Sequence, residues 1–326
     1  MENENNLKRS FLDLNKKWGT QISLAVALVI LIVIFSTFSK YFFTFNNFVN
    51  IGHYMSILGI MAAGCSVALI VGALDVSQYS ILAFVGVSCI MLDRAGVNII
   101  LVFLFALFVG TLLGAINGFI VTVLKIHPII GTIATAMVMR GFTYMITESR
   151  TLGLSPETRG YYYLIGRGTF LGIPITIIVM AVIYLIIFII LRHTKLGRYI
   201  FAVGSNSNAS FLTGINLKSV RFGALMISGW TAGISGFLLM AQIGSFQPNT
   251  GEAALLDVIA AVLLGGIALT GGSGKLTGTI LGVVVLIIIQ NGMTLLGIQS
   301  FWQMIVRGLI ILIAVYVNVL RGGGFK

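Results

Sequence analysis

The chain has 326 residues, of which 58% are hydrophobic and 9% are charged, and its mean hydropathy is +1.05. These values lie far outside the range of soluble domains and exclude a fold that is stable in water alone. A net charge of +11 is typical of nucleic-acid binding, but here the basic residues lie beside apolar segments. We therefore attribute the charge to membrane topology and expect no nucleic-acid partner.

About ten apolar stretches follow one another along the chain. Because a hydrocarbon core of roughly 30 Å needs about 20 helical residues, and because backbone groups need internal partners in lipid, each stretch is predicted to be a helix. The continuous apolar runs at 23–35 and 175–191 argue against a β-barrel. We therefore predict an all-α integral membrane protein, a polytopic bundle of about ten transmembrane helices. The predicted spans are 19–38, 52–73, 79–92, 98–122, 129–147, 173–191, 222–243, 254–270, 276–296 and 300–320.

The basic residues indicate the orientation of this bundle. With ten spans, most of them fall on the side of the N-terminus, which the positive-inside rule assigns to the cytoplasm. Both termini are therefore expected in the cytoplasm, and the first span, which lacks a cleavage site, is predicted to be retained. The residues on this side are Lys8, Arg9, Lys16, Lys17, Lys125, Arg192, Lys195, Arg198, Lys218, Arg221, Arg321 and Lys326, whereas Lys40, Arg94, Arg150, Arg159 and Arg167 fall opposite.

Span parity also predicts the organisation of the chain. We expect a single transmembrane domain, 1–326, with a cytoplasmic N-terminal segment at 1–18, a first helical block at 50–147, a cytoplasmic loop at 192–221 and a second block at 220–320. The two blocks enter the membrane from opposite faces. They are therefore predicted to be inverted, an arrangement that is common among transporters.

The loop at 192–221 is much longer than a connector requires. The run Asn206-Ser207-Asn208 is placed to cap a short helix over 209–213, and Gly214 is placed to end it. Such a helix on the cytoplasmic face would offer a surface to a partner protein. The alternative, an ordinary solvated loop, stays open on these residues alone.

Asp75 is an acidic residue between the second and third spans. A charged side chain at membrane depth costs roughly 2.5–3.5 kcal/mol on insertion scales, so its presence needs a reason. In one interpretation the helix is broken here, a new helix is capped by Asp75 or Ser77, and backbone groups point at a polar solute. In the other, Asp75 caps a helix in a tight cytoplasmic turn. We give both interpretations equal weight.

Two further polar residues lie inside predicted spans. Asn117 is flanked by Gly114 and Gly118, whose spacing permits close helix approach, so helix packing is favoured over substrate contact. Arg140 is expected to pair with Glu148 or to face an aqueous cavity.

Sequence motifs for catalysis are lacking. Glu252 and Asp257 are five residues apart and do not share a helical face, which disfavours an acid/base pair. The glycine-rich run at 265–279 has Leu276 where a phosphate-binding loop needs Ser or Thr, so we predict a tight turn between helices. We expect no catalytic residue, no metal and no cofactor, and any ATP would be hydrolysed by another subunit.

Four segments resemble those of one family. They are GALDVSQYSILAFVGV at 72–87, GAINGFIVTVLKIHPIIGTIATAMVMRG at 114–141, LGRYIFAVGSNSNASFLTGIN at 196–216 and LLDVIAAVLLGGIALTGGSGKLTGTILG at 255–282. Together they resemble the permease subunits of bacterial ATP-binding-cassette importers for simple sugars. The second and third segments carry the family's residues Asn117, Pro128, Thr132, Arg140, Arg198, Gly204, Asn206, Ala209 and Gly214.

The resemblance implies an inner-membrane permease that dimerises with itself or with a related permease in the surrounding lipid. A separate ATPase, which binds the ATP, would dock on the loop at 197–215, and a periplasmic or lipid-anchored solute-binding protein would dock on the outer face. The residues implied for the substrate pathway are Asp75, Ser77, Asn117, Thr132 and Arg140. Those implied for coupling to the ATPase are Arg198, Gly204, Asn206, Ala209 and Gly214.

The chain departs from the family pattern at Ala73, Gln78, Tyr79 and Leu255. A ribose-type monosaccharide is the first expectation for the substrate, and autoinducer-2 or a nucleoside is the alternative. A proton-coupled carrier that uses Asp75 or Glu252 is a further alternative. An intramembrane enzyme is disfavoured because the charged residues in the spans are dispersed.

Overall fold

The computed structural model describes residues 2–322, and for residues 2–18, 317, 318 and 320–322 it describes the backbone alone. The N-terminal segment 1–18 therefore begins outside the described residues. The charges of Lys8, Arg9, Lys16 and Lys17, and those of Arg321 and Lys326, lie outside the described side chains.

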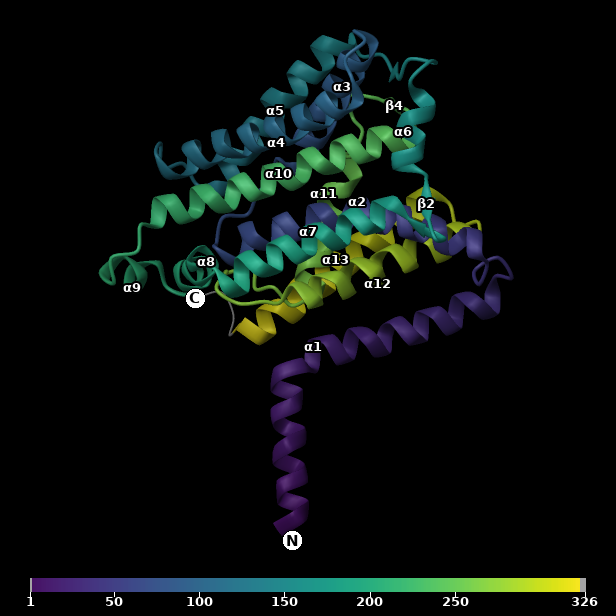
Figure 1. The fold of residues 1–326 in the computed structure, drawn as a ribbon. Coiled ribbons are helices and arrows are strands. Elements are labelled where there is room, and N and C mark those ends of the chain that lie inside the picture. The colour runs from purple at the N-terminus through teal and green to yellow at the C-terminus, as the bar shows by residue number, and fades with distance from the viewer. Residues whose placement is uncertain (1, 323–326) are drawn as a thin grey trace.

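Each predicted span appears as a helix, which confirms an all-α, polytopic membrane protein (Figure 1). Among the described residues, seven helices are long and apolar enough to cross a membrane. The helices that correspond to the spans are α1 (Glu2–Phe38), α2 (Phe45–Ile70), α3 (Gln78–Arg94), α4 (Ile99–Thr122), α5 (Pro128–Thr147), α7 (Ile175–His193), α10 (Leu217–Ile243), α11 (Glu252–Leu264), α12 (Leu276–Leu295) and α13 (Ser300–Gly322).

Several predicted boundaries were wrong, with differences of five to seven residues at the starts of α2 and α10 and at the end of α11. α2 begins seven residues before position 52, because the Thr44 side chain caps it by accepting from the backbone N–H of Asn47. α11 ends at Leu264 and not at 270, because Gly266 has a φ of +85° that a continuing helix cannot contain.

Three helices and four two-residue strands lie between the spans. The helices are α6 (Arg159–Gly166), α8 (Lys195–Ser205) and α9 (Ser207–Leu212), and the strands are β1 (Leu152–Gly153), β2 (Thr169–Phe170), β3 (Ile173–Pro174) and β4 (Ser245–Phe246). β1 pairs antiparallel with β4, with Leu152 opposite Phe246, and β2 pairs antiparallel with β3. α6, α8 and the strands were not predicted from the sequence.

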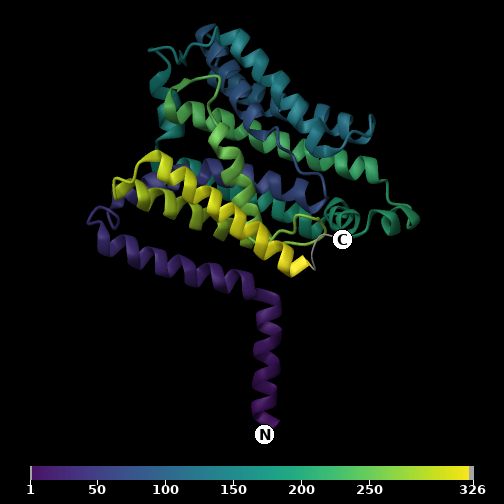
Figure 2. The ribbon, with the colours of Figure 1, turned by 180° about the vertical axis from the view of Figure 1, so that it is seen from behind.

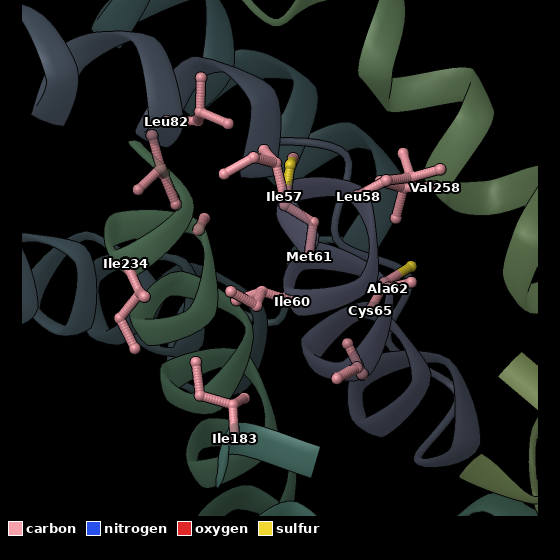
Figure 3. Packing of buried hydrophobic residues seen from close by; sticks show 14 of the residues in the cluster. Ile57, Leu58, Ile60, Met61, Ala62, Cys65, Leu82, Ile183, Ile234 and Val258 are labelled. Carbon is pink, nitrogen blue, oxygen red and sulfur yellow. The ribbon is translucent and has the colours of Figure 1, made fainter. Parts of the chain in front are cut away.

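α2 and α10 form the centre of the bundle. The most apolar stretch of α2 is 89% buried and that of α10 is 78% buried, whereas the corresponding stretches of α4 and α1 are 22% and 6% buried. Figure 3 shows Ile60 of α2 facing α10, with Ile234 on α10 and Leu82 on α3. The outer helices expose apolar side chains to lipid, and α1 runs along α12 (Figures 1 and 2).

The two expected blocks have corresponding contacts. α4 contacts α10 and α12 contacts α2, α3 contacts α4 and α5, and α11 contacts α12 and α13. Helices in equivalent positions of 50–147 and 220–320 thus have equivalent partners. The boundaries of the blocks and their inverted relation stay predictions.

Glycines bring α4 and α10 into backbone contact. A Cβ atom added at Gly114 would lie 2.5 Å from the carbonyl oxygen of Leu225 and 3.0 Å from the Cα of Gly229, and one added at Gly118 would lie 2.8 Å from the ring of Phe222. Small residues permit this approach, which suits helix association in lipid. Gly114 and Gly118 therefore pack helices together, as their spacing predicts.

We expect Gly229→Val to destabilise the bundle by about 1–3 kcal/mol or more, the cost of inserting atoms into a packed core. A Cβ at this position would lie 2.6 Å from both the Cα and the N of Gly114. Thermal unfolding of the purified protein in detergent measures the effect. Gly141→Val is the control, because a Cβ at Gly141 in α5 would meet nothing within 4 Å. Equal midpoints for the two variants would contradict the packing role.

Candidate functional site

Asp75 lies in a break between α2 and α3. The chain reverses at Gly72, whose φ is +78°, and continues without helix to Ser77. The Asp75 side chain is buried, and its Oδ1 accepts hydrogen bonds from the backbone N–H of Ser77 at 2.9 Å and from Ser77 Oγ at 2.6 Å. Its Oδ2 accepts a hydrogen bond from Ser228 Oγ of α10 at 2.7 Å. The carboxylate therefore joins the break to α10.

Gln78 shows how deep in the bundle α3 begins. Its Nε2 donates to the carbonyl oxygens of Met61, at 3.2 Å, and Ser228, at 3.3 Å. Both carbonyls lie in the middle of long helices, α2 and α10. The first residue of α3 thus lies beside the middle of the bundle. This geometry matches the broken-helix interpretation and does not match a cap in a cytoplasmic turn.

Hydrogen bonds extend from this break to α4 and α5. Asn117 Nδ2 donates to Ser77 Oγ at 2.6 Å, and Asn117 Oδ1 accepts from Thr135 Oγ1 at 2.6 Å. Thr132 Oγ1 accepts from the backbone N–H of Val76 at 3.1 Å. We call the connected set the polar network; it comprises Asp75, Ser77, Asn117, Thr132, Thr135 and Ser228.

The polar network brings together four of the five residues expected on a substrate pathway. Its members are at most 9% exposed, so in this conformation they are sealed from both faces of the bundle. They comprise a carboxylate, an amide and four hydroxyl groups, which suit hydrogen bonding to a polar neutral solute better than bond cleavage. Buried polar groups of this kind are costly unless they are satisfied, and here they satisfy one another.

Thr135 and Ser228 were missed by the sequence analysis. Thr135 follows Thr132 by three residues and therefore lies on the same face of α5. This spacing was the available signal. Ser228 lies among small residues of α10, where a hydroxyl is typical of helix packing, and no pattern in the sequence connects it to Asp75.

Arg140, the fifth expected pathway residue, lies outside the polar network. Its Nη1 and Nη2 bind Glu252 Oε1 and Oε2 of α11 at 2.9 and 2.6 Å, and its guanidinium lies 5.8 Å from the centre of the Tyr144 ring. The predicted pairing with Glu148 was wrong, since Glu148 instead approaches Arg150 at 3.8 Å. The pair therefore links α5 to α11, which belong to the two different blocks that the sequence predicts.

The two carboxylates of α11 have separate partners. Asp257 lies 3.5 Å from Arg307 of α13, whereas Glu252 binds Arg140. They do not form an acid/base pair, as their spacing predicts.

The expected loop at 192–221 consists largely of helix. Thr194 caps α8 by accepting from the N–H of Gly197, and Asn206 Oδ1 caps α9 by accepting from the N–H of Ala209 at 2.9 Å. Gly214, with a φ of +82°, follows the end of α9. The short helix is thus confirmed, with Asn206 as its cap and Gly214 after its end, but it runs over Ser207–Leu212 and so begins two residues earlier than predicted. The side chains of Arg198 and Ala209 are exposed, which leaves them accessible to a partner.

The end of α8 contacts the segment that leads to Asp75. Gly204 packs against the carbonyl oxygen of Ile70, the last residue of α2, and a Cβ at Gly204 would lie 2.6 Å from the N of Gly272. The Gly272 N–H donates to the Ile70 carbonyl at 2.8 Å, and Ser205 Oγ donates to the Gly272 carbonyl at 3.2 Å. One chain of contacts therefore connects the exposed helices α8 and α9 with the polar network.

On the opposite end of α3, Asp93 fastens the segment that carries α6. Its two oxygens accept hydrogen bonds from the N–H of Ser155 at 2.8 Å and from Thr158 Oγ1 at 2.6 Å. Burial, together with the neighbouring Asp93 carboxylate, raises the pKa of Tyr162 in α6, so this phenol stays neutral. These contacts hold α6 and the residues before it in place at that end of the bundle.

Comparisons with known proteins agree with this architecture. A family model described as branched-chain amino acid transport system / permease component matches residues 47–315. The ribose import permease protein RbsC of Escherichia coli strain K12 is 36% identical over 304 residues, which cover 93% of this chain and 95% of the relative. RbsC of Bacillus subtilis strain 168 is 35% identical over 294 residues, with coverage of 90% and 91%. The D-allose transport system permease protein AlsC of Escherichia coli strain K12 is 32% identical over 302 residues, with coverage of 92% and 90%.

No solved structure matches the chain. The family model covers most of the ten helices that correspond to the predicted spans, and each of the relatives aligns over nearly its whole length. The chain therefore belongs to this family of membrane-embedded transport permeases.

Proposed function

We propose that the chain is the membrane-spanning permease subunit of an ATP-binding-cassette importer, and that its substrate is a ribose-type monosaccharide. The observation that carries this proposal is the chain of contacts from α8 through Ile70 and Gly272 to the polar network. An importer driven by a separate ATPase needs such a link between a docking surface and a polar passage. Similarity to ribose and allose permeases supports a sugar as the substrate.

In this proposal the ATPase docks on 197–215, with Arg198 and Ala209 at the surface that it contacts. The permease lies in the bacterial inner membrane with both termini in the cytoplasm, pairs with an identical or related permease, and receives its substrate from a solute-binding protein on the outer face. A shift of α8 would displace Ile70 and Gly272, and with them the segment 71–77 that bears Asp75.

The polar network suits a solute that is rich in hydroxyl groups. When the segment 71–77 moves, hydrogen bonds between network members are exchanged for hydrogen bonds to the sugar. A typical hydrogen bond contributes about 0.5–1.5 kcal/mol net, so this exchange costs little in either direction. A neutral solute also avoids the cost of carrying charge through the bundle.

Uptake of labelled sugar in a strain that lacks the gene tests the assignment. Restoring the gene is expected to restore uptake of ribose or of a closely related sugar, and uptake is expected to survive collapse of the proton gradient but not ATP depletion. If the deletion leaves the uptake of ribose, xylose, galactose and allose unchanged, the sugar assignment fails, and autoinducer-2 and nucleosides become the probes. Uptake that survives ATP depletion but stops when the proton gradient collapses would establish the proton-coupled alternative.

We expect Arg140→Gln and Glu252→Gln each to lower uptake several-fold while changing stability by less than about 1 kcal/mol. The small stability effect follows from exposure, because the two side chains are 27% and 53% exposed and such pairs contribute little. The loss of uptake is expected because each variant breaks the ion pair that links α5 of one proposed block to α11 of the other. Uptake and thermal unfolding are measured together, and the charge-swapped double variant R140E/E252R is expected to recover uptake. A swap that is no better than the single variants would show that the pairing itself is not required.

A further inference from the structure

A cavity of about 300 Å³ lies where the end of α4 meets the beginnings of α5 and α10. It is on the same side of the bundle as α8 and α9, because α10 follows α9 after a four-residue turn. Its apolar walls include Val121, Ile126 and Leu217, and its cations are Lys125, Lys218 and Arg221. The volume lies at the lower end of the range for small-molecule sites, about 300–1,000 Å³.

The cations of this cavity lack anionic partners among the described residues. The ion pairs in that part of the chain join Arg140 to Glu252, Arg150 to Glu148 and Arg307 to Asp257, and none includes Lys125, Lys218 or Arg221. No acidic residue lines the cavity.

Arg221 carries the strongest indication of a missing ligand. Its Nε atom is buried and has no hydrogen-bond acceptor. Buried donors are almost always paired, so this N–H calls for an acceptor that the protein does not supply. Pro128 and Leu217 are the first residues of α5 and α10, and both line the cavity. The positive ends of two helix dipoles therefore also favour an anion here.

The surroundings favour a lipid as the source of the anion. Leu124, Ile130 and Ile133 are exposed on α5 and on the turn that precedes it, by 54%, 64% and 41%. In a bilayer these side chains contact acyl chains. A lipid with its chains along this surface would place its headgroup at the cavity. Basic pockets between transmembrane helices are known to bind anionic headgroups.

We propose that the cavity between α4, α5 and α10 binds the phosphate headgroup of an anionic phospholipid from the leaflet on the α8–α9 side. The phosphate oxygens accept hydrogen bonds from Arg221 and pair with Lys125 and Lys218. The bound lipid would hold the start of α5 against the start of α10, next to the turn that joins α9 to α10. The site is distinct from the polar network and does not depend on the identity of the transported solute.

Native mass spectrometry of the full-length permease in a neutral detergent tests the site. The probe is dioleoylphosphatidylglycerol, with dioleoylphosphatidylcholine as the neutral reference. The variant K125Q/K218Q removes two exposed lysines of the cavity, and the control R192Q/K195Q removes the same charge from exposed positions near α8. We expect the variant to weaken phosphatidylglycerol binding about 25-fold, about fivefold for each lysine, and the control to change it by less than about twofold.

Arg221→Met supplies a second variant, which removes the unpaired donor and is expected to weaken the same binding. Thermal unfolding in detergent alone checks that each variant is folded. Equal weakening in K125Q/K218Q and R192Q/K195Q would show general surface attraction and overturn the proposal. Competition by inorganic phosphate as effective as that by the lipid would reveal a free-anion site instead. Unchanged lipid binding with loss of ATPase co-purification would assign the surface to a protein partner.

Discussion

Replacing Asp75 with Ala is expected to abolish uptake and to destabilise the bundle by several kcal/mol. The carboxylate accepts hydrogen bonds from three buried donors, namely the backbone N–H and the hydroxyl of Ser77 and the hydroxyl of Ser228. Alanine leaves all three without this acceptor, at about 1–3 kcal/mol for each donor that stays unsatisfied. Labelled ribose uptake and the midpoint of thermal unfolding in detergent measure the two effects.

Two further variants separate the hydrogen bonds of Asp75 from its charge. Asp75→Asn keeps one oxygen for Ser77 and presents an amide donor to Ser228, whose hydroxyl can also accept. It is therefore expected to fold. Ser228→Ala leaves Asp75 Oδ2 without its hydrogen-bond donor, at about 1–3 kcal/mol or more, and keeps the carboxyl group in place. A D75A variant with wild-type uptake and an unchanged unfolding midpoint would exclude Asp75 from the passage.

The same variants decide between the proposed function and the proton-coupled alternative. A carrier that protonates Asp75 in each cycle needs an ionisable group there, so D75N would stop uptake even when it is folded. In an ATP-driven permease the position needs hydrogen-bonding capacity and not a proton. D75N is therefore expected to retain part of the uptake that D75A loses.

The helices that span the membrane could be predicted because their signal is local. Hydropathy and the thickness of a bilayer predict each span. The ends of α9 could be predicted because the capping residue Asn206 and Gly214 are also local signals. α8 was missed because it lies along the surface, where its buried residues Gly197, Ile200 and Val203 are too few to raise the hydropathy. A helix that buries only one narrow face has too low a mean hydropathy to be distinguished from a loop when membrane spans are predicted.

The partners within the site could not be predicted, because they depend on how distant segments pack. Glu148 is the acid that follows Arg140 in the sequence, but it ends α5 with a φ of +49° and does not reach Arg140. The actual partner, Glu252, is 112 residues away. Likewise, Ser228 meets Asp75 only because the chain between α2 and α3 turns back into the bundle beside α10.

Gly204→Val and Ala209→Trp are expected to impair transport in two different ways. Gly204 contacts Ile70 and Gly272, so a side chain there would push α8 away from the segment that leads to Asp75. The ATPase would still dock, but its activity would no longer respond to the loaded solute-binding protein. Uptake should fall about 5- to 150-fold, the range of typical coupling free energies between linked sites. Ala209 is exposed, so tryptophan leaves the permease folded and blocks docking itself.

Co-purification of the ATPase, stimulated ATP hydrolysis and sugar uptake together distinguish these two effects. Gly204→Val should retain the ATPase and lose stimulation, whereas Ala209→Trp should lose the ATPase altogether. Gly141→Val is the control, because a Cβ at Gly141 in α5 would meet nothing within 4 Å and Gly141 lies outside both the docking helices and the segment that carries α6. If Gly204→Val kept full stimulation and uptake, the contact between α8 and Ile70 would not transmit the movement. The route from ATPase to passage would then have to run through another part of the bundle.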